Sequence, residues 1–254
     1  MKSSYIVVFG SGELAKTGTQ THTAIAKQTN MKDPRVVILT TPVGFQPNKI
    51  NLAQEIKDHM EQALYNYHPR VSILDIPTRK EANDEHVVSA IAGADYIYFG
   101  GGSPTYLIKT ISDTLLLRRV IEAVHNEWAS LSLASASAIA FSRWSLPVYE
   151  IFKVGEDLHW VEGLNISSLL SLPTTYSFLP HRNNNEGGTK LDTSYCYMGV
   201  DRFKKLYALL PDAEKEEVVY GIDEHTSLII NVQTNVLQSF GKGSYSDLHL
   251  TNTI

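Results

Sequence analysis

The sequence has very little cysteine. Cys196 is the only cysteine among the 254 residues, so the chain cannot form a disulfide within itself. A cysteine-based metal cluster is excluded for the same reason. Free thiols are typical of a reducing compartment, and we expect a cytoplasmic protein.

Positive charge and long apolar runs are also missing. The 27 acidic residues outnumber the 22 lysines and arginines, the formal net charge is −5, and no basic run is long enough for a polyanion. We therefore expect no nucleic-acid partner. No stretch approaches the roughly 20 apolar residues that a membrane-crossing helix needs. The N-terminal stretch MKSSYIVVFGSGE lacks the cleavage pattern of a signal peptide, and we expect no membrane association.

What is present is an ordinary globular composition. Hydrophobic residues make up 43% of the chain and charged residues 19%, as in most soluble globular proteins. A chain of 254 residues can bury a substantial core, as one large domain or two small ones. Because the sequence shows no internal repeat, low-complexity linker or composition boundary, we interpret residues 1–254 as a single domain.

Short apolar runs alternate with helical patterns in the first half of the chain. This alternation predicts a mostly parallel sheet covered by helices on both faces, which is a doubly wound α/β fold. Ligands of such folds lie beyond the carboxyl ends of the strands. The predicted strands cover residues 5–10, 35–42, 70–77, 95–104 and 130–135, and the predicted helices cover 21–30, 48–67, 82–94 and 104–127.

The second half of the chain has a different pattern. Residues 218–250 contain several short strand-like runs, with a turn expected at Gln233–Asn235. We expect antiparallel hairpins that close one edge of the sheet. Residues 181–188, HRNNNEGG, form a polar stretch without periodicity and are predicted to be a loop suited to a functional site.

Glycines follow the first predicted strand at a spacing found in dinucleotide-binding proteins. Gly10, Gly12 and Ala15 occupy this spacing in FGSGELA. The second predicted strand ends in LTTP, however, and has no acidic residue to hold a ribose. The alternative interpretation is a tight turn between strand and helix that requires glycine.

A second glycine group ends the fourth predicted strand. In FGGGSP, Gly100, Gly101 and Gly102 precede Ser103 and Pro104, which begin a predicted helix. Glycines leave backbone N–H groups open to a ligand, and a helix N-terminus favours negative charge. The pattern predicts an oxyanion hole or a carboxylate site, although a glycine-rich turn without a ligand has the same sequence.

The stretch SLSLASASAIAF, residues 130–141, indicates a strand that turns sharply into a helix. A nucleophile on such an elbow needs small residues two positions before and after it. Ser135 is the candidate, with Leu133 before it and Ser137 after it. Ser137 as nucleophile would have Ser135 and Ile139 as flanks, which fit no better. The other interpretation is a purely structural turn.

A serine nucleophile needs a base, and His181 is the candidate. His181 follows a short apolar run and begins the polar loop, whereas His59, His86 and His125 fall in amphipathic helical patterns. A histidine on a loop after a strand is the usual arrangement of a Ser–His–acid site on a doubly wound sheet. An exposed loop histidine is the alternative. The acids between Ser135 and His181 that could orient the imidazole are Glu150, Glu156, Asp157 and Glu162.

Taken together, these segments resemble the S51 serine peptidases, the group that contains dipeptidase E and cyanophycinase, within the class I glutamine amidotransferase-like fold. The resemblance covers nearly the whole chain, with its segments in the family's order. They are GSGE, TTP, YFGGGSPTYL, ASASAIAF, EGLNI, LPH, GIDEHTSLII and GKGSYS.

The resemblance implies a role for individual residues. Ser135 matches the nucleophile and His181 the general base, and Glu150 is the best match for the acid. The activity implied is hydrolysis of a small peptide or amide next to an aspartyl-type residue, through an acyl-enzyme and without metal or another cofactor. The resemblance is also consistent with a homodimer.

The remaining matches concern the oxyanion hole and the substrate. Gly101 and Gly102 match glycines near the oxyanion hole, and the Ala136 N–H is the second donor. Ser103 stands where family members often carry Asp or Asn for the substrate. Arg182, beside the histidine, could pair with a substrate carboxylate, although an exposed loop arginine needs no such role.

Two residues of the elbow depart from the family pattern. Ser137 and Leu133 stand where the family has glycines, two after and two before the nucleophile. Added bulk where strand and helix meet could relax the elbow. The alternative hypothesis is therefore a catalytically impaired relative that binds a small ligand or a partner in the same pocket.

Overall fold

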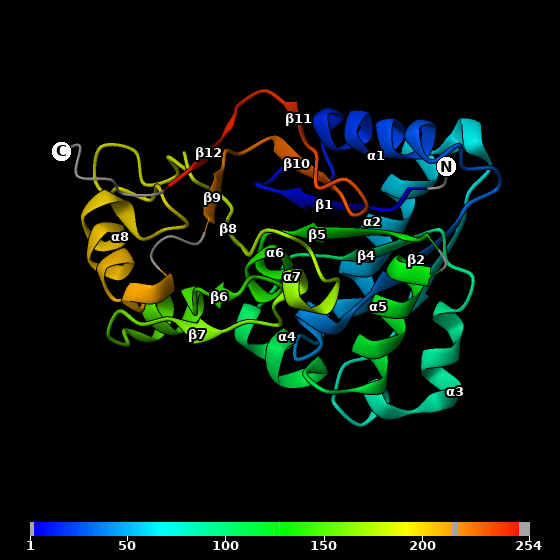
Figure 1. The fold of residues 1–254 in the computed structure, drawn as a ribbon, viewed down its shortest axis with the longest axis horizontal. Coiled ribbons are helices and arrows are strands. Elements are labelled where there is room, and N and C mark those ends of the chain that lie inside the picture. Colours follow the sequence, from blue (N-terminus) through cyan, green and yellow to red (C-terminus); the bar gives the residue numbers. More distant parts are fainter. Residues whose placement is uncertain (1–2, 127, 215–217, 249–254) are drawn as a thin grey trace.

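A computed structural model describes residues 3–126, 128–214 and 218–248. Its centre is a seven-stranded sheet with the strand order β11-β10-β1-β5-β4-β2-β3 (Figure 1). The five strands from β1 to β3 in this order run parallel, and β10 and β11 add an antiparallel edge beside β1. The strands are β1 (Tyr5–Phe9), β2 (Arg35–Leu39), β3 (Arg70–Leu74), β4 (Tyr96–Phe99), β5 (Ser130–Ala134), β10 (Thr226–Asn231) and β11 (Leu237–Gly241).

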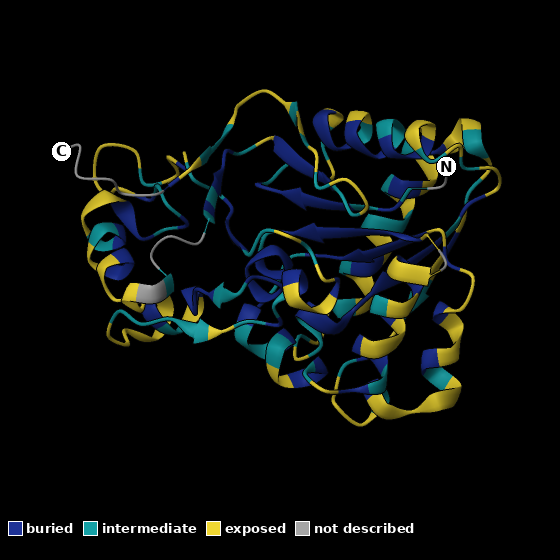
Figure 2. Ribbon diagram, viewed as in Figure 1, coloured by how far each residue is buried: buried dark blue, intermediate teal, exposed yellow. Residues whose placement is uncertain are grey.

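Helices cover both faces of this sheet. Successive residues of each strand point to opposite faces, and apolar residues lie on both, so each face is buried under helices. On one face, α1 (Lys16–Gln28) and α2 (Lys49–Ala63) bury apolar residues against the sheet. On the other face, α4 (Pro104–Ile111) and α5 (Leu115–Asn126) do the same. Figure 2 shows the sheet as a buried layer between helices that expose their outer sides. The predicted doubly wound α/β fold is confirmed.

Two predicted helices differ from the observed ones. The helical pattern at 104–127 is interrupted between α4 and α5, where Asp113 adopts a positive φ of 56°. Ser, Asp and Thr side chains compete for backbone hydrogen bonds, and Thr114 donates its hydroxyl to the Ile111 carbonyl here. The pattern at 82–94 contains only the short α3 (Glu85–Val88) with 3₁₀ turns on either side.

The C-terminal strands are divided between two sheets. The expected hairpin is present in β10 and β11, with the Asn235 N–H closing its turn on the Asn231 carbonyl. In contrast, β8 (Tyr176–Leu179), β9 (Val218–Ile222) and β12 (Tyr245–Asp247) form a separate three-stranded sheet. The expectation that all C-terminal strands close the edge of the main sheet is therefore wrong. The chain bends between β9 and β10, where His225 has a φ of 54°.

The remaining elements are short, apart from α8. Residue 127, at the end of the predicted helix 104–127, and residues 249–250, at the end of the predicted strand region 218–250, lie outside the described residues. The remaining elements are α6 (Ala136–Ala140), α7 (Ile166–Leu169), α8 (Gly199–Ala208), paired strands β6 (Trp144–Ser145) and β7 (Val161–Glu162), a π-helical turn at Glu150–Val154, and 3₁₀ turns at Thr41–Val43, Tyr65–Tyr67, Glu81–Asn83, Ser89–Ile91 and Asp212–Glu214.

Candidate active site

Ser135 lies on a sharp turn between β5 and α6. Its backbone has φ 50° and ψ −109°, a conformation that non-glycine residues rarely adopt. Such a residue costs on the order of 1–3 kcal/mol and is common where an active site requires it. The Ser135 carbonyl nonetheless accepts the Ile139 N–H and begins α6. The turn has the geometry of a nucleophile elbow, with the hydroxyl at the tip of the sheet.

The two residues that depart from the family's glycines are accommodated in this elbow. Leu133 is fully buried in the core on the α4 and α5 face of the sheet. Ser137 is also buried, and its hydroxyl donates to the Gly100 carbonyl. Leu133 is therefore packed in the core, and Ser137 has a hydrogen-bond partner. Ser135 keeps its strained backbone conformation between them.

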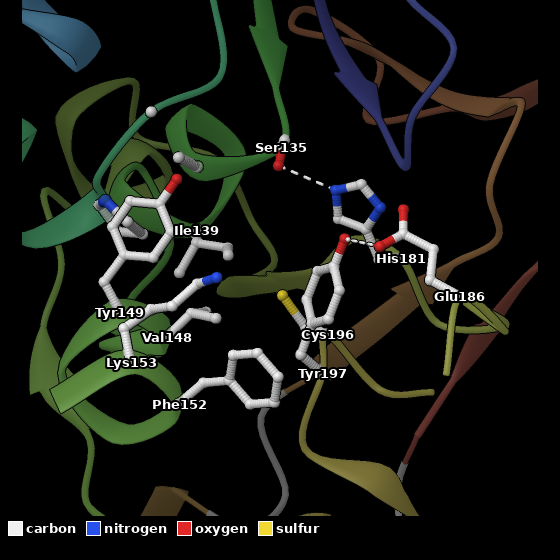
Figure 3. Close-up of a pocket in the computed structure, with 13 residues that line it drawn as sticks. Ser135, Ile139, Val148, Tyr149, Phe152, Lys153, His181, Glu186, Cys196 and Tyr197 are labelled. Atoms are coloured by element: carbon white, nitrogen blue, oxygen red, sulfur yellow. Dashed lines mark hydrogen bonds between the residues drawn. The ribbon is translucent and has the colours of Figure 1, made fainter. Parts of the chain in front are cut away.

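His181 follows β8 and faces Ser135. The Ser135 Oγ lies 2.9 Å from His181 Nε2 (Figure 3). The backbone N–H of His181 donates to the Gly10 carbonyl over 3.1 Å, which ties this loop to the end of β1. The side chain is only 16% exposed. The structure thus brings the predicted serine and histidine within hydrogen-bond distance.

Glu224 lies on the other nitrogen of the imidazole. Its Oε1 is 3.0 Å from His181 Nδ1 and also accepts the Asn184 amide over 2.7 Å. A carboxylate only accepts hydrogen bonds, so Nδ1 carries the proton and Nε2 is free to accept from Ser135. The hydrogen bond from His181, with help from Asn184, holds the pKa of the Glu224 carboxyl below its ordinary value. The result is a continuous Ser–His–Glu chain.

The structure corrects the predicted position of Glu150. Glu150 does not contact His181: its Oε1 accepts the Thr105 hydroxyl, and its Oε2 is buried with no partner among the described residues. The other acids considered also have different neighbours. Glu156 lies 3.8 Å from His159, the Asp157 carbonyl is 2.9 Å from His159 Nδ1, and Glu162 pairs with Arg143.

Sequence reasoning missed Glu224 because it sought the acid between the serine and the histidine. Glu224 lies 43 positions after His181. The available signal was GIDEHTSLII, in which two acids, Asp223 and Glu224, stand between two strand-like runs. Because β8 and β9 are parallel, their carboxyl ends meet at one edge of the smaller sheet, and residues after each strand become neighbours.

Arg182 is paired within the protein. Its Nε and Nη2 lie 2.7 and 2.9 Å from the two carboxylate oxygens of Asp223. It also donates to the hydroxyls of Ser244 and Ser246. Burial alone would raise the pKa of the Asp223 carboxyl, but the hydrogen bonds from Arg182 and Ser244 bring it below its ordinary value. The expectation that Arg182 binds a substrate carboxylate is therefore not supported, since its guanidinium is already occupied.

The glycine group after β4 lies beside the serine. A Cβ atom on Gly101 would be 3.9 Å from the Cβ of Ser135. Gly102 has a φ of 149° and packs so closely on the Pro42 carbonyl that a Cβ would lie 2.1 Å away. Ala136 is the first residue of α6, so its N–H has no partner within the helix. The backbone N–H groups at these three positions suit the role of oxyanion donors.

Ser103 has a local role in this loop. Its Oγ accepts the Tyr106 N–H over 3.2 Å and caps α4. The same oxygen lies 3.0 Å from the Thr105 hydroxyl. Ser103 is buried, and it does not line the pocket that contains Ser135. Its side chain stabilises the loop, and the structure does not bring it to the serine.

The glycines after β1 support the loop that carries Glu224. A Cβ on Gly10 would lie 2.1 Å from the Asp223 carbonyl oxygen, and one on Gly12 would lie 2.5 Å from His225 Nδ1. Close approach of the Asp223–His225 segment therefore requires glycine at both positions. This packing favours the tight-turn interpretation of GSGE over a dinucleotide site.

Ser135 and His181 line a cavity of about 290 Å³ (Figure 3). Lys153 contributes an ammonium group, and Glu186 contributes a carboxylate that accepts the Tyr197 hydroxyl. Burial raises the pKa of the Cys196 thiol to about 12, so it stays protonated at neutral pH and is a poor nucleophile. The cavity is lined by Gly102, Pro104, Ser135, Ala136, Ile139, Val148, Tyr149, Phe152, Lys153, His181, Glu186, Cys196 and Tyr197.

The described residues contain neither a metal-binding cluster nor a membrane-spanning helix. No group of three or more His, Cys, Asp or Glu side chains among them is arranged to hold a metal ion. Within the same ranges, no helix combines the length and apolarity required to span a bilayer.

Comparison with known proteins adds a family and a fold. The family model described as peptidase family S51 matches residues 6–237. No curated protein matches the chain. A crystal structure of a peptidase from an acI-B1 Actinobacterium has a TM-score of 0.72 and 23% identity, over 97% of this chain and 91% of that one. A peptidase E-like protein from Listeria monocytogenes EGD-e has a TM-score of 0.57 and 16% identity, over 95% and 100%. These similarities agree with a class I glutamine amidotransferase-like fold.

Proposed function

The chain belongs to peptidase family S51, and on that premise we propose that it is a serine peptidase acting on short peptides through Ser135, His181 and Glu224. The observation that carries this proposal is the chain of contacts Ser135 Oγ–His181 Nε2 at 2.9 Å and His181 Nδ1–Glu224 Oε1 at 3.0 Å. The strained backbone of Ser135 supports it independently.

In the first step, Ser135 Oγ forms a bond to the substrate carbonyl carbon while His181 Nε2 takes the hydroxyl proton. The carbonyl oxygen becomes an oxyanion in the tetrahedral intermediate. Glu224 keeps Nδ1 protonated and stabilises the imidazolium that forms. Its lowered pKa keeps this carboxylate ionised at neutral pH.

The oxyanion needs donors that are already in place. The Ala136 N–H at the start of α6 and a backbone N–H of the Gly101–Gly102 loop are the candidates. Losing one such donor costs about 10²- to 10³-fold in kcat.

The acyl-enzyme then forms and is hydrolysed. The tetrahedral intermediate collapses, the peptide C–N bond breaks, and the leaving amine takes the proton from His181 Nε2. A water molecule next gives a proton to His181 and attacks the ester carbonyl. The Ser135 Oγ leaves with that proton, which releases the acid product and restores the enzyme.

The substrate we propose is a small peptide or amide with an aspartyl-type residue beside the cleaved bond. The family resemblance suggests this residue, and the ammonium group of Lys153 in the pocket offers a charge partner for its carboxylate. A cavity of about 290 Å³ also suits a short substrate better than an extended protein segment.

Labelling with a small serine-reactive phosphonate tests the proposal. We expect a single adduct on Ser135 by intact mass and peptide mapping, and no adduct on the Ser135→Ala variant. Ser137→Ala is the matched control, since it changes a serine two positions away whose hydroxyl is already bonded to Gly100, and it should still be labelled. A folded protein that gives no adduct would instead favour a non-catalytic relative that binds a ligand in this pocket.

A further inference from the structure

A second cavity adjoins the active-site pocket. It has a volume of about 270 Å³ and shares Gly102 and Tyr149 with the pocket that contains Ser135. Neither Ser135 nor His181 lines it. The two cavities adjoin at Gly102, in the glycine loop beside the serine, and a ligand that occupies both must cross this residue. Its lining residues are Glu13, Leu14, Leu39, Thr40, Pro42, Val43, Gln46, Leu52, Ala53, Glu55, Ile56, Gly100, Gly101, Gly102 and Tyr149.

The walls of this second cavity are mainly aliphatic. Leu52, Ala53 and Ile56 come from α2, and Val43 comes from the turn after β2. Gly100 helps to keep the space open, because a Cβ there would lie 3.3 Å from Ile56 Cδ1. Walls of this kind favour an apolar side chain of moderate size.

Two carboxylates interrupt the aliphatic lining. Among the described residues, neither Glu13 nor Glu55 has an ion-pair partner, although both line the cavity. Glu13 also lies near the buried Tyr98 hydroxyl, whose pKa is raised by burial and, to a smaller extent, by the Glu13 charge. Unpaired carboxylates beside an apolar cavity favour a ligand that carries a positive charge next to an apolar group.

The chemistry of the serine fixes which part of a peptide reaches this second cavity. The leaving amine must take a proton from His181, so the leaving residue lies on the histidine side of the first pocket. His181 does not line the second cavity. The second cavity adjoins the first pocket at Gly102 rather than at His181, and this position suits the acyl side of the cleaved bond.

We infer that the second cavity binds an aliphatic N-terminal residue that precedes the residue whose carbonyl Ser135 attacks. Its side chain packs on Val43, Leu52 and Ile56, and its free ammonium group faces Glu13 and Glu55. This assignment rests on the proposed function. It makes the preferred substrate one residue longer than a dipeptide, with an aliphatic residue before the aspartyl residue.

Binding to the Ser135→Ala variant tests this inference without requiring cleavage. Isothermal titration would compare the tripeptides Leu-Asp-Leu and Gly-Asp-Leu. We expect the leucine peptide to bind roughly tenfold more tightly, because its side chain is removed from water. N-acetylation of the leucine peptide should weaken binding roughly fivefold, since the ammonium charge is lost. Equal affinities, or no binding of either peptide, would overturn the inference.

A filled cavity provides the second arm of the test. In the Ser135→Ala background, Val43→Trp places a large ring in the second cavity and should abolish the preference for leucine over glycine. Val236→Trp is the matched control, because Val236 is 53% exposed near the hairpin between β10 and β11 and does not line the cavity. It should retain the preference. If both variants retain it, leucine binds elsewhere and the assignment is wrong.

The two proposals fail in different ways. A phosphonate adduct on Ser135 with equal binding of the two peptides would contradict only the second cavity. Preferential binding of the leucine peptide without any adduct on Ser135 would contradict the peptidase mechanism and would leave the second cavity as a binding site for an aliphatic N-terminal residue.

Discussion

The candidate active site is assembled from two regions that are held together by different forces. Ser135 and the glycine loop follow β5 and β4, which are adjacent parallel strands of the main sheet. All residues of both strands are buried, so apolar packing on the sheet faces fixes this nucleophile region. Its geometry depends little on charged groups.

The region that carries the base and the acid depends on polar contacts. His181 and Arg182 follow β8, Asp223 and Glu224 follow β9, and the four residues form two adjacent pairs. The stretch Tyr195–Tyr197 covers them with three consecutive positive φ angles, and the N–H groups of its first two residues donate to the carbonyls of Arg182 and His181. Left-handed residues other than glycine cost roughly 1–2 kcal/mol each, which the contacts around them must offset.

This difference shows how the proposed triad of Ser135, His181 and Glu224 can join two sheets. The nucleophile needs a strained backbone, which the main sheet can hold because its core is large. The histidine needs an oriented imidazole, which charged and hydrogen-bonded neighbours provide. The His181 N–H on the Gly10 carbonyl connects the two regions at the end of β1.

The largest expected effect separates the two candidate acids. Glu224→Gln should lower kcat by about 10³- to 10⁴-fold, because the amide no longer stabilises the imidazolium. Glu150→Gln is the matched control, since an amide oxygen can still accept the Thr105 hydroxyl. Its kcat should change by less than about tenfold. Steady-state kinetics on an aspartyl peptide gives both kcat values. A larger loss of kcat for Glu150→Gln than for Glu224→Gln would assign the role of the acid to Glu150.

A smaller effect is expected from breaking the ion pair between Arg182 and Asp223. Arg182→Met leaves the Asp223 carboxylate, which is 8% exposed, without its guanidinium. We expect a loss of about 2 kcal/mol in the free energy of unfolding, or a fall of about 6 °C in Tm. Thermal unfolding followed by circular dichroism measures this.

Arg119→Met is the control for this prediction. Arg119 pairs with Glu122 at 3.0 Å, but both side chains are 49% exposed, and its loss should cost less than about 0.5 kcal/mol. Similar losses in the two variants would show that the pair in the base region is no more important than a surface pair.

The smallest effect is a local response to acid. The pKa values of Asp223 and Glu224 are lowered in the fold, so both carboxylates stabilise it above the pKa of the unfolded chain. This contribution disappears as the pH falls through the lowered folded values. Hydrogen exchange, corrected for the intrinsic rate, should show residues 181–198 and 221–225 losing protection before residues 130–140 at about pH 3. Simultaneous loss in all three segments would indicate that the two regions respond as one.

The sequence alone predicted where Ser135 and the glycine loop lie in the fold. The alternation of apolar strands and helices specified the doubly wound sheet, and the turn chemistry of LASASA and FGGGSP pointed to Ser135 and the glycine loop. Both features are local, since a few consecutive residues define the end of a strand and the start of a helix. His181 was predicted for the same reason, from its position directly after the LP of a strand-like run.

Only the tertiary structure decided which acid faces the histidine and what Arg182 binds. The family resemblance points to Glu150, but the pairing of β8 with β9 brings Glu224 to the imidazole and Asp223 to the guanidinium. Strand pairing in a second sheet depends on contacts between residues far apart in sequence, and no local pattern records them. The sequence therefore determined the main fold and the positions of Ser135 and His181, whereas packing between the sheets determined which carboxylate faces the imidazole, because that partner is selected by its distance in space.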